Sequence, residues 1–272
     1  MPAVPTRIDG PVAVIGDVHG QTEKLRSIIG QIARLPDIED RWIVFVGDLV
    51  DRGPDPAGTV QLYCELAEQH SKVTWVCGNH ELAMADSLGL LPTPDFVDLS
   101  QSWVSHYLSE PTFESYGVPH GDLKALRKAV PESHARLLAD LPWSVEHSDY
   151  LFVHAGLDKN MSFETQVRVL RERDYSLGHP PWLYSKEFII AGAPLDSPVP
   201  VVVGHVPLPA VQIQKGMIAI DTGSGNGGPL SCVLLPEQKV LSSEPQAAPS
   251  ASPSVPPPPP RVESQRPWWR PW

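Results

Sequence analysis

Residues that could bind metal ions or move protons recur wherever a short apolar run of the chain ends. Early runs end in carboxylate, amide or imidazole side chains, and two later runs end in histidine. These residues are Asp17, His19, Asp48, Asn79, His80, His154 and His205. Oxygen and imidazole ligands without thiolates suit borderline divalent ions such as Mn²⁺, Fe²⁺ or Zn²⁺. The residue types therefore favour a metal site.

The stretch VFVGDLVDRG, residues 44–53, places unusual charge at the end of one such run. Asp48, Asp51 and Arg52 follow a strand-like segment of β-branched and aromatic residues. Charge at the end of a buried strand is costly unless something compensates it. A metal ion, a phosphate or a paired side chain would each be sufficient.

Single motifs of this kind carry little weight, and it is their repetition that is informative. Asp17 and His19 are two residues apart, so an extended backbone would point both to one side, yet such pairs are common by chance. Asn79 after a glycine is also typical of a turn. A lone His154 is more often a hydrogen-bonded core residue than a ligand. Five strand ends with ligand-type residues are hard to obtain by accident.

The elements that must position these residues follow from the hydrophobic pattern. Continuous apolar runs predict buried strands at 12–17, 42–48, 73–79, 150–156, 201–205, 217–223 and 231–235. Helical spacing over 21–35 and 57–70 separates the early runs. Strand alternating with helix predicts an α/β fold, in which ligands bind beyond the carboxyl ends of strands. From about 84 to 149 the pattern becomes mostly helical, and we call this segment the helical insertion.

Composition narrows the class of protein. The chain has 272 residues with a formal net charge of −11, which argues against a nucleic-acid partner. The apolar positions of Cys64, Cys77 and Cys232 predict buried free thiols, which fit a reducing compartment. No run approaches the roughly 20 apolar residues of a membrane span. The first ten residues are too polar for a signal peptide, so we expect a cytoplasmic protein.

The end of the chain differs in composition from the rest. We expect a catalytic domain over 1–242 and a flexible tail over 243–272, which is rich in proline and ends in RPWWRPW. Clustered Trp and Arg are typical of binding hot spots. The segment 266–272 is therefore a candidate anchor for a peptide groove on a partner or on a neighbouring subunit. The alternative is a solvated terminus.

Three early motifs together identify a family resemblance. GDVHG (16–20), GDLVDRG (47–53) and GNHE (78–81) resemble the motifs of the PPP-family phosphoprotein phosphatases, of bacterial type, within the calcineurin-like metallophosphoesterase superfamily. FVHAGL (152–157), VVVGHVP (201–207) and AIDTGSGNGGPL (219–230) resemble later segments of that family. The resemblance covers about 12–235. It implies two packed β-sheets flanked by helices, with the mostly helical insertion beside them.

The resemblance also implies a dinuclear metal site. Two divalent ions are expected, Mn²⁺ first, with Fe or Zn as alternatives. The implied ligands are Asp17, His19 and Asp48 for the first ion, and Asp48 as a bridge with Asn79, His154 and His205 for the second. Such ions activate a water for in-line attack on phosphorus.

The remaining polar residues of the motifs receive catalytic roles from the same resemblance. His80 is the expected general acid, Asp51 pairs with His80 and favours its protonated form, and Arg52 grips the phosphate. The resemblance also implies that Asn79 and His80 contact the substrate. One departure concerns a second phosphate-binding arginine of many relatives. In PWLYSKEFI (181–189) its place is taken by Ser185, with Lys186 beside it as a possible substitute.

The resemblance implies a metal-dependent phosphomonoester hydrolase, a Ser/Thr or Tyr phosphatase acting on phosphoprotein. The first alternative is a symmetrical dinucleoside tetraphosphate hydrolase. Those relatives tend to read GDLVARG, so Asp51 favours the protein phosphatase. The second alternative is a non-catalytic scaffold that recruits partners through its tail, which the complete ligand set argues against.

Overall fold

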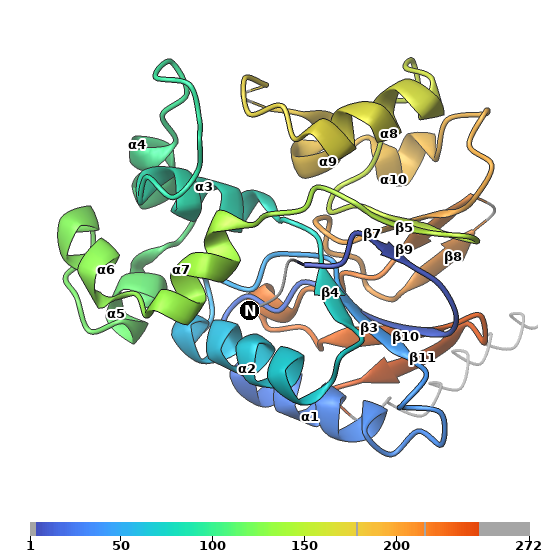
Figure 1. Ribbon diagram of the computed structural model, residues 1–272. Helices are drawn as coiled ribbons and strands as arrows, with labels where there is room; N and C mark the ends of the chain where they lie inside the picture. Colours follow the sequence, from blue (N-terminus) through green and yellow to red (C-terminus); the bar gives the residue numbers. More distant parts are fainter. Residues whose placement is uncertain (1–3, 178, 215, 245–272) are drawn as a thin grey trace, which may run out of the picture.

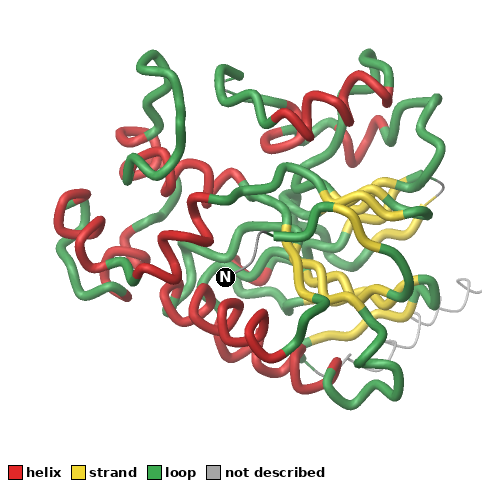
Figure 2. Tube along the Cα trace, viewed as in Figure 1, coloured by secondary structure: helices red, strands yellow, loops and turns green. Residues whose placement is uncertain are grey.

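A computed structural model describes residues 4–177, 179–214 and 216–244 of the chain. Within them, two β-sheets pack face to face and helices surround them (Figure 1; Figure 2). This arrangement confirms the predicted α/β class with two packed sheets. The proposed anchor at 266–272 lies outside the described residues.

The first sheet has five strands in the order β11-β10-β2-β3-β4. Strands β2, β3 and β4 run parallel, and β10 runs antiparallel to both β2 and β11. Their bounds are Val12–Ile15 for β2, Trp42–Phe45 for β3, Val73–Trp75 for β4, Ser231–Leu235 for β10 and Lys239–Ser242 for β11. All but β11 were predicted, and β2, β3 and β4 end before their apolar runs do.

The second sheet has six strands in the order β1-β5-β6-β7-β9-β8. Strands β6, β7 and β9 run parallel to one another. The carboxyl ends of β6 and β7 therefore lie at the same edge of the sheet. The bounds are Arg7–Ile8 for β1, Val145–His147 for β5, Leu151–Phe152 for β6, Val201–Val203 for β7, Gln212–Gln214 for β8 and Met217–Ala219 for β9.

An apolar layer joins the two sheets. Val14 and Val44 of the first sheet pack in one buried cluster with Phe152, Val202 and Ile218 of the second. Successive side chains of a strand point to opposite faces. Their neighbours along β2 and β3 therefore face the helices instead and belong to the other core cluster. Strands buried on both faces explain why their sequences are continuous apolar runs.

Two helices cover the outer face of the first sheet (Figure 1). Helix α1 spans Thr22–Ile32 and buries Leu25, Ile28 and Ile32, as its spacing predicted. Helix α2 spans Pro56–Gln69, and its N-cap residue Asp55 accepts a hydrogen bond from Gly58 N. A proline at the first helical position and an aspartate cap are a typical helix start.

The helical insertion follows β4 and forms one side of the molecule (Figure 1). Helix α3 at Asn79–Ser87 leads into it, and its own helices are α4 at Ser100–His106, α5 at Glu110–Ser115, α6 at Leu123–Ala129 and α7 at Glu132–Ala139. The predicted helical character is confirmed, although β5 already begins at Val145. Three further helices were not predicted: α8 at Phe163–Glu172, α9 at Pro181–Tyr184 and α10 at Phe188–Ala191.

The three cysteines are buried free thiols, as predicted. Burial raises the pKa of Cys77 and of Cys232, so both remain protonated and inert. Among the described helices, none combines the length and the apolar character that crossing a membrane requires.

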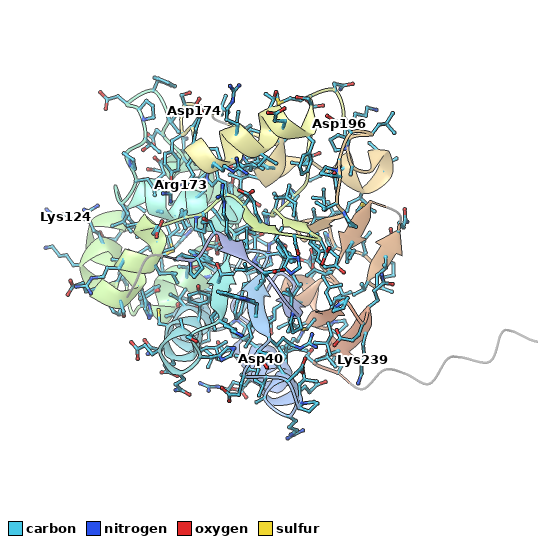
Figure 3. All side chains as sticks on the ribbon, turned by 45° about the vertical axis from the view of Figure 1, so that its right-hand side comes forward. Asp40, Lys124, Arg173, Asp174, Asp196 and Lys239 are labelled. Atoms are coloured by element: carbon cyan, nitrogen blue, oxygen red, sulfur yellow. The ribbon has the colours of Figure 1, made fainter. Side chains whose placement is uncertain are left out.

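Arg41 is an exception to the rule that charged side chains lie at the surface. Asp40 and Lys239, labelled in Figure 3, are exposed, whereas Arg41 is 1% exposed. Its guanidinium donates to Val12 O at 3.0 Å and Leu235 O at 3.2 Å, and it pairs with Asp37 and Glu237. One side chain thus ties β2, β10 and the loop before β3 together.

Replacing Arg41 by Met should lower the free energy of unfolding by about 1–3 kcal/mol, because two buried carbonyls lose their donor. Urea unfolding followed by tryptophan fluorescence measures the change. The control is Arg136→Met, which removes an exposed pair with Glu132 on α7 and should cost about 0.5 kcal/mol or less. Equal effects of the two variants would contradict the role given to Arg41.

Candidate active site

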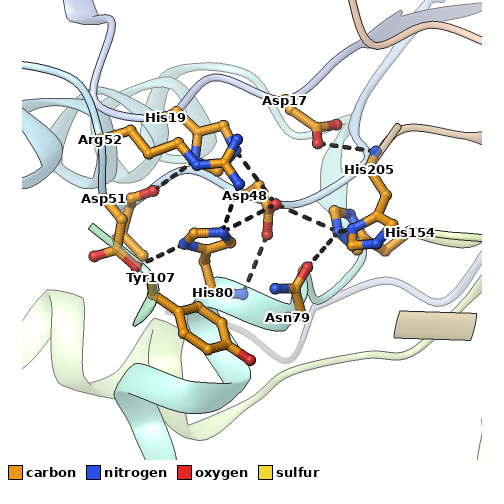
Figure 4. A network of polar contacts seen from close by, with 12 residues as sticks. Asp17, His19, Asp48, Asp51, Arg52, Asn79, His80, Tyr107, His154 and His205 are labelled. Carbon is orange, nitrogen blue, oxygen red and sulfur yellow. Dashed lines mark hydrogen bonds and ion pairs between the residues drawn. The ribbon is translucent and has the colours of Figure 1, made fainter. Parts of the chain in front are cut away.

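The loops after five strands bring the predicted polar residues together (Figure 4). Strands β2, β3 and β4 carry the early motifs, and β6 and β7 carry the two later histidines. The residues drawn together in Figure 4 include Asp17, His19, Asp48, Asp51, Arg52, Asn79, His80, His154 and His205. Convergence at the carboxyl ends of parallel strands is therefore what the structure shows.

The carboxylate of Asp48 lies at the centre of this group. Its Oδ2 is 3.4 Å from His19 Nε2, 3.4 Å from His154 Nε2 and 3.9 Å from His80 Nε2. Its Oδ1 accepts a hydrogen bond from His80 N at 3.2 Å. Burial alone would raise the pKa of Asp48, but the surrounding imidazoles hold it well below its usual value.

Two groups of potential metal ligands share Asp48. One contains His19, Asp48 and His80, the other Asp48, His154 and His205, and the ligand atoms of each group lie within 4.8 Å of one another. Such clusters are consistent with a dinuclear metal site. Asn79 Oδ1 is adjacent to the second group, 3.0 Å from His154 Nε2. His80 thus lies among possible ligands, a position that the motif alone did not indicate.

Backbone carbonyls orient two of the imidazoles. The Nδ1 atom of His19 is 2.9 Å from Val50 O, and that of His154 is 2.7 Å from Val46 O. A carbonyl can only accept, so each Nδ1 carries a proton. The other ring nitrogen of each histidine, Nε2, faces Asp48 Oδ2. A carbonyl bound to the far ring nitrogen is the usual support of a metal-binding histidine.

Asp17 lies beside the second group rather than inside either one. Its Oδ2 accepts a hydrogen bond from His205 N at 2.9 Å. Its Oδ1 is buried without a hydrogen-bond partner among the described residues, and so is His205 Nε2. Burial, reinforced by Asp221, raises the pKa of Asp17 well above its ordinary value. A buried carboxylate oxygen without a donor is a position that a cation would satisfy, so these residues fit a metal.

The histidines of the second group differ in charge preference. Burial and the neighbouring His154 lower the pKa of His205 to about 3. Burial also opposes a charge on His154, but Asp48 outweighs it and raises the pKa of His154 to about 10. The negative potential that attracts a proton to His154 would equally hold a metal cation. His19 is kept neutral by burial, which lowers its pKa well below the usual value.

Tight turns replace extended backbone at the strand ends. The expectation that Asp17 and His19 share one extended segment is wrong, because β2 ends at Ile15 and His19 has φ of 49°. Asp48 also has a positive φ, 54°. A Cβ on Gly78 would lie 2.1 Å from Asp48 Oδ1, so only glycine permits this approach.

Glu81, to which the sequence assigned no role, anchors the loop that carries Asp48. Its Oε1 accepts from Leu49 N at 2.7 Å and Val50 N at 3.1 Å, and its Oε2 from Asp48 N at 2.8 Å and Gly78 N at 3.1 Å. Burial and the Asp48 carboxylate raise the pKa of Glu81 to about 7, while the N–H donors favour its charged form. The only signal for this role was its position three residues after Gly78 at a helix start.

A cleft of about 500 Å³ opens over the group. Its walls include Arg52, His80 and His205 from the strand ends, Tyr107 from the helical insertion and Lys186 from the segment between α9 and α10. Arg52 Nη2 lies 3.2 Å from His80 Nε2, and His80 Nδ1 lies 2.7 Å from Asp51 Oδ2. Two cationic side chains and an imidazole thus line a cleft that could admit an anionic substrate.

Comparisons with known proteins agree with this geometry. A family model described as calcineurin-like phosphoesterase matches residues 10–229. Serine/threonine-protein phosphatase 1 of Salmonella typhimurium is 27% identical over 81% of this chain and 89% of its own length. The asymmetrical bis(5'-nucleosyl)-tetraphosphatase PrpE of Oceanobacillus iheyensis is 24% identical over 85% of this chain and 91% of its own length.

Matches to eukaryotic phosphatases are shorter. The serine/threonine-protein phosphatase 4 catalytic subunit of Eremothecium gossypii is 34% identical over 28% of this chain and 24% of its own length. Matches of this kind cover 17% to 24% of the eukaryotic relatives.

Solved structures share the fold. The cold-active protein-tyrosine phosphatase of a psychrophilic Shewanella has a TM-score of 0.57 at 18% identity, over 89% of this chain and 83% of that chain. A protein serine/threonine phosphatase from Saccharomyces cerevisiae has a TM-score of 0.58 at 16% identity, over 91% and 86%.

Replacing Glu81 by Gln should loosen the Asp48 loop, because an amide NH₂ group would face two backbone N–H donors. Each buried donor left unpaired costs about 1–3 kcal/mol, so we expect the free energy of unfolding to fall by about 2 kcal/mol or more. Thermal and urea unfolding measure this. The exposed Glu68 on α2 provides the control Glu68→Gln, and comparable stabilities of the two variants would refute the anchoring role.

Proposed function

The chain belongs to the calcineurin-like phosphoesterases, and from this premise we propose that it is a metal-dependent phosphomonoester hydrolase acting on phosphoproteins. The observation that carries the proposal is Asp48, one buried carboxylate shared by two groups of possible metal ligands. The cleft above it presents Arg52 and Lys186 to an anionic substrate.

The metal ligands that we propose are those implied by the family resemblance, and the groups around Asp48 supply most of them. They are Asp17, His19 and Asp48 for one ion, and Asp48, Asn79, His154 and His205 for the other. Mn²⁺ is our first choice, with Fe or Zn as alternatives, because the donors are oxygen and imidazole nitrogen. When bound, such ions supply positive charge to phosphate oxygens and make a water nucleophilic at neutral pH.

The protein's own residues then bind the phosphate and deliver a proton. Arg52 can hold phosphate oxygens with two N–H groups, and Lys186 adds a second positive charge to the lining of the cleft. In the structure His80 Nε2 lies 3.2 Å from Arg52 Nη2, and once Arg52 binds the phosphate instead, a protonated His80 would donate the proton on Nε2 to the oxygen of the leaving group. Asp51 Oδ2 accepts a hydrogen bond from Nδ1, the other ring nitrogen of His80, at 2.7 Å. This contact fixes the direction in which Nε2 points.

Phosphoprotein is the substrate class that we favour. Asp51 is present and bonded to His80, whereas the resemblance associates symmetrical tetraphosphate hydrolases with its absence. Lys186 stands in for a second arginine as a point charge and not as a planar fork. The second candidate is a dinucleoside tetraphosphate hydrolase, which the similarity to PrpE over 85% of this chain supports. A scaffold without activity is the least supported reading, since the ligand set is complete.

A substrate comparison tests the proposal. Purified protein with Mn²⁺ is assayed against phosphoserine, phosphothreonine and phosphotyrosine peptides and against diadenosine tetraphosphate. We expect at least one phosphopeptide to give the highest kcat/KM, and chelation to abolish turnover until Mn²⁺ is restored. A preference for the tetraphosphate would support the second candidate. Turnover by a demonstrably metal-free sample would disprove metal dependence.

Replacing His80 by Asn should separate acid catalysis from metal binding. A general acid contributes about 10²–10⁴-fold to the rate. We therefore expect a loss in kcat of that order for a poor leaving group, with bound metal unchanged by elemental analysis. The control His120→Asn alters an exposed histidine of the helical insertion and should retain activity. Loss of metal from the His80 variant would show that His80 is a ligand, as its place in the first group permits.

A further inference from the structure

We propose that Trp103 and Thr112 of the helical insertion are positioning residues, which fix Asp51 and through it the direction of His80. This inference rests on the proposed function, because it assigns the purpose of their contacts to proton delivery by His80. It makes the helical insertion part of the catalytic unit rather than an addition beside it.

The carboxylate of Asp51 is fully buried, with an exposed fraction of 0%. Its Oδ2 accepts from Trp103 Nε1 at 2.9 Å as well as from His80 Nδ1 at 2.7 Å. Its Oδ1 accepts from Thr112 Oγ1 at 2.5 Å. Both oxygens are thus held by donors of α4 and α5, and the carboxylate cannot turn without breaking a buried hydrogen bond.

The same hydroxyl also binds the backbone. Thr112 Oγ1 accepts from Asp51 N at 3.1 Å while it donates to the Asp51 carboxylate. The next amide, Arg52 N, donates to Leu108 O at 3.1 Å. Both N–H groups of the Asp51–Arg52 pair are therefore satisfied by the helical insertion.

These backbone contacts matter because the pair is strained. Asp51 has φ of 69° and Arg52 has φ of 63°, both in the left-handed region. Such conformations are unfavourable for residues other than glycine and persist only where their surroundings over-determine them. The helical insertion supplies these surroundings, and it holds in place the two residues that orient the acid and bind the phosphate.

The hydrogen bond from Trp103 Nε1 to Asp51 distinguishes Trp103 from the other buried tryptophans that the structure describes. Trp75, Trp103, Trp143 and Trp182 are all buried, with exposed fractions of 1% or less. Within the described part of the chain, the Nε1 atoms of Trp75, Trp143 and Trp182 find no hydrogen-bond partner. Trp103 alone of the four directs its N–H at a carboxylate, so its contact with Asp51 is not a general consequence of burying tryptophan.

A third residue of the helical insertion confines the His80 ring. The ring of Tyr107 packs edge-to-face against it, with centroids 4.8 Å apart. His80 is thus held at Nδ1 by Asp51 and on its side by Tyr107, which leaves Nε2 directed toward the cleft and Asp48.

The test uses Trp103→Phe and Thr112→Val, each of which removes a donor and keeps most of the side-chain volume. Hydrolysis of phenyl phosphate and 4-nitrophenyl phosphate is measured with Mn²⁺. Phenolate is the poorer leaving group and depends more on protonation. We expect kcat for phenyl phosphate to fall by about tenfold or more, part of the effect of a general acid. The loss for the nitrophenyl ester should be clearly smaller, with KM and metal content unchanged.

Two controls separate positioning from folding. Thr112→Ser keeps the hydroxyl and should restore the rate on phenyl phosphate. Trp143→Phe makes the same change at an indole without a described partner and should leave the ratio of the two rates as in the wild type. If the Thr112 variant does not fold, Trp103→Phe alone decides.

Two outcomes would overturn the inference while leaving the proposed function intact. One is an equal loss on both esters, and the other is wild-type rates on both esters in Trp103→Phe and Thr112→Val. A wild-type protein that hydrolyses neither ester with Mn²⁺ would instead refute the proposed function and, with it, this inference.

Discussion

The convergence of three imidazoles on one buried carboxylate sets the requirements for the rest of the site. His19, His80 and His154 all approach Asp48 Oδ2 within 3.9 Å, yet they come from three different strand ends in two sheets. A buried charge of this kind is tolerated only when its partners are held firmly. The sharp turn at Gly47, the close approach at Gly78 and the four N–H groups that Glu81 collects all keep that carboxylate in place.

The apolar layer between the sheets holds the partners of Asp48 in place. Val44 and Val202 lie in the same buried cluster, and the strands that carry them lead directly to Asp48 and His205. Close-packed interiors deform little, so the distance between the two strand ends is set by side-chain volume in this layer. Apolar contacts that take no part in the proposed reaction thus set the alignment of the polar site.

The sequence predicted the strand ends well because each motif is local. An apolar run, a glycine and a ligand-type residue lie within a few positions, and parallel strands bring such ends together. Glu81 was visible in its motif, but its four partners depend on how two loops meet. Trp103 and Thr112 could not be predicted, since they lie 52 and 61 residues from Asp51 in a segment whose helical pattern says nothing about what its side chains contact. Strands as short as β1, with two residues, carry no periodicity to detect.

The hydrogen bonds from His19 and His154 to Val50 O and Val46 O bear on how this site could diverge. In both cases the acceptor is the main chain, which every amino acid possesses. No point substitution at Val46 or Val50 can delete these acceptors, so the hydrogen bonds that orient both rings do not depend on which side chains occupy those two positions. Asp17 Oδ1 and His205 Nε2 differ from these atoms, because neither has a hydrogen-bond partner among the described residues. A bound ion would give these two atoms the partner that the described residues do not supply, whereas the rings of His19 and His154 are already oriented by the main chain.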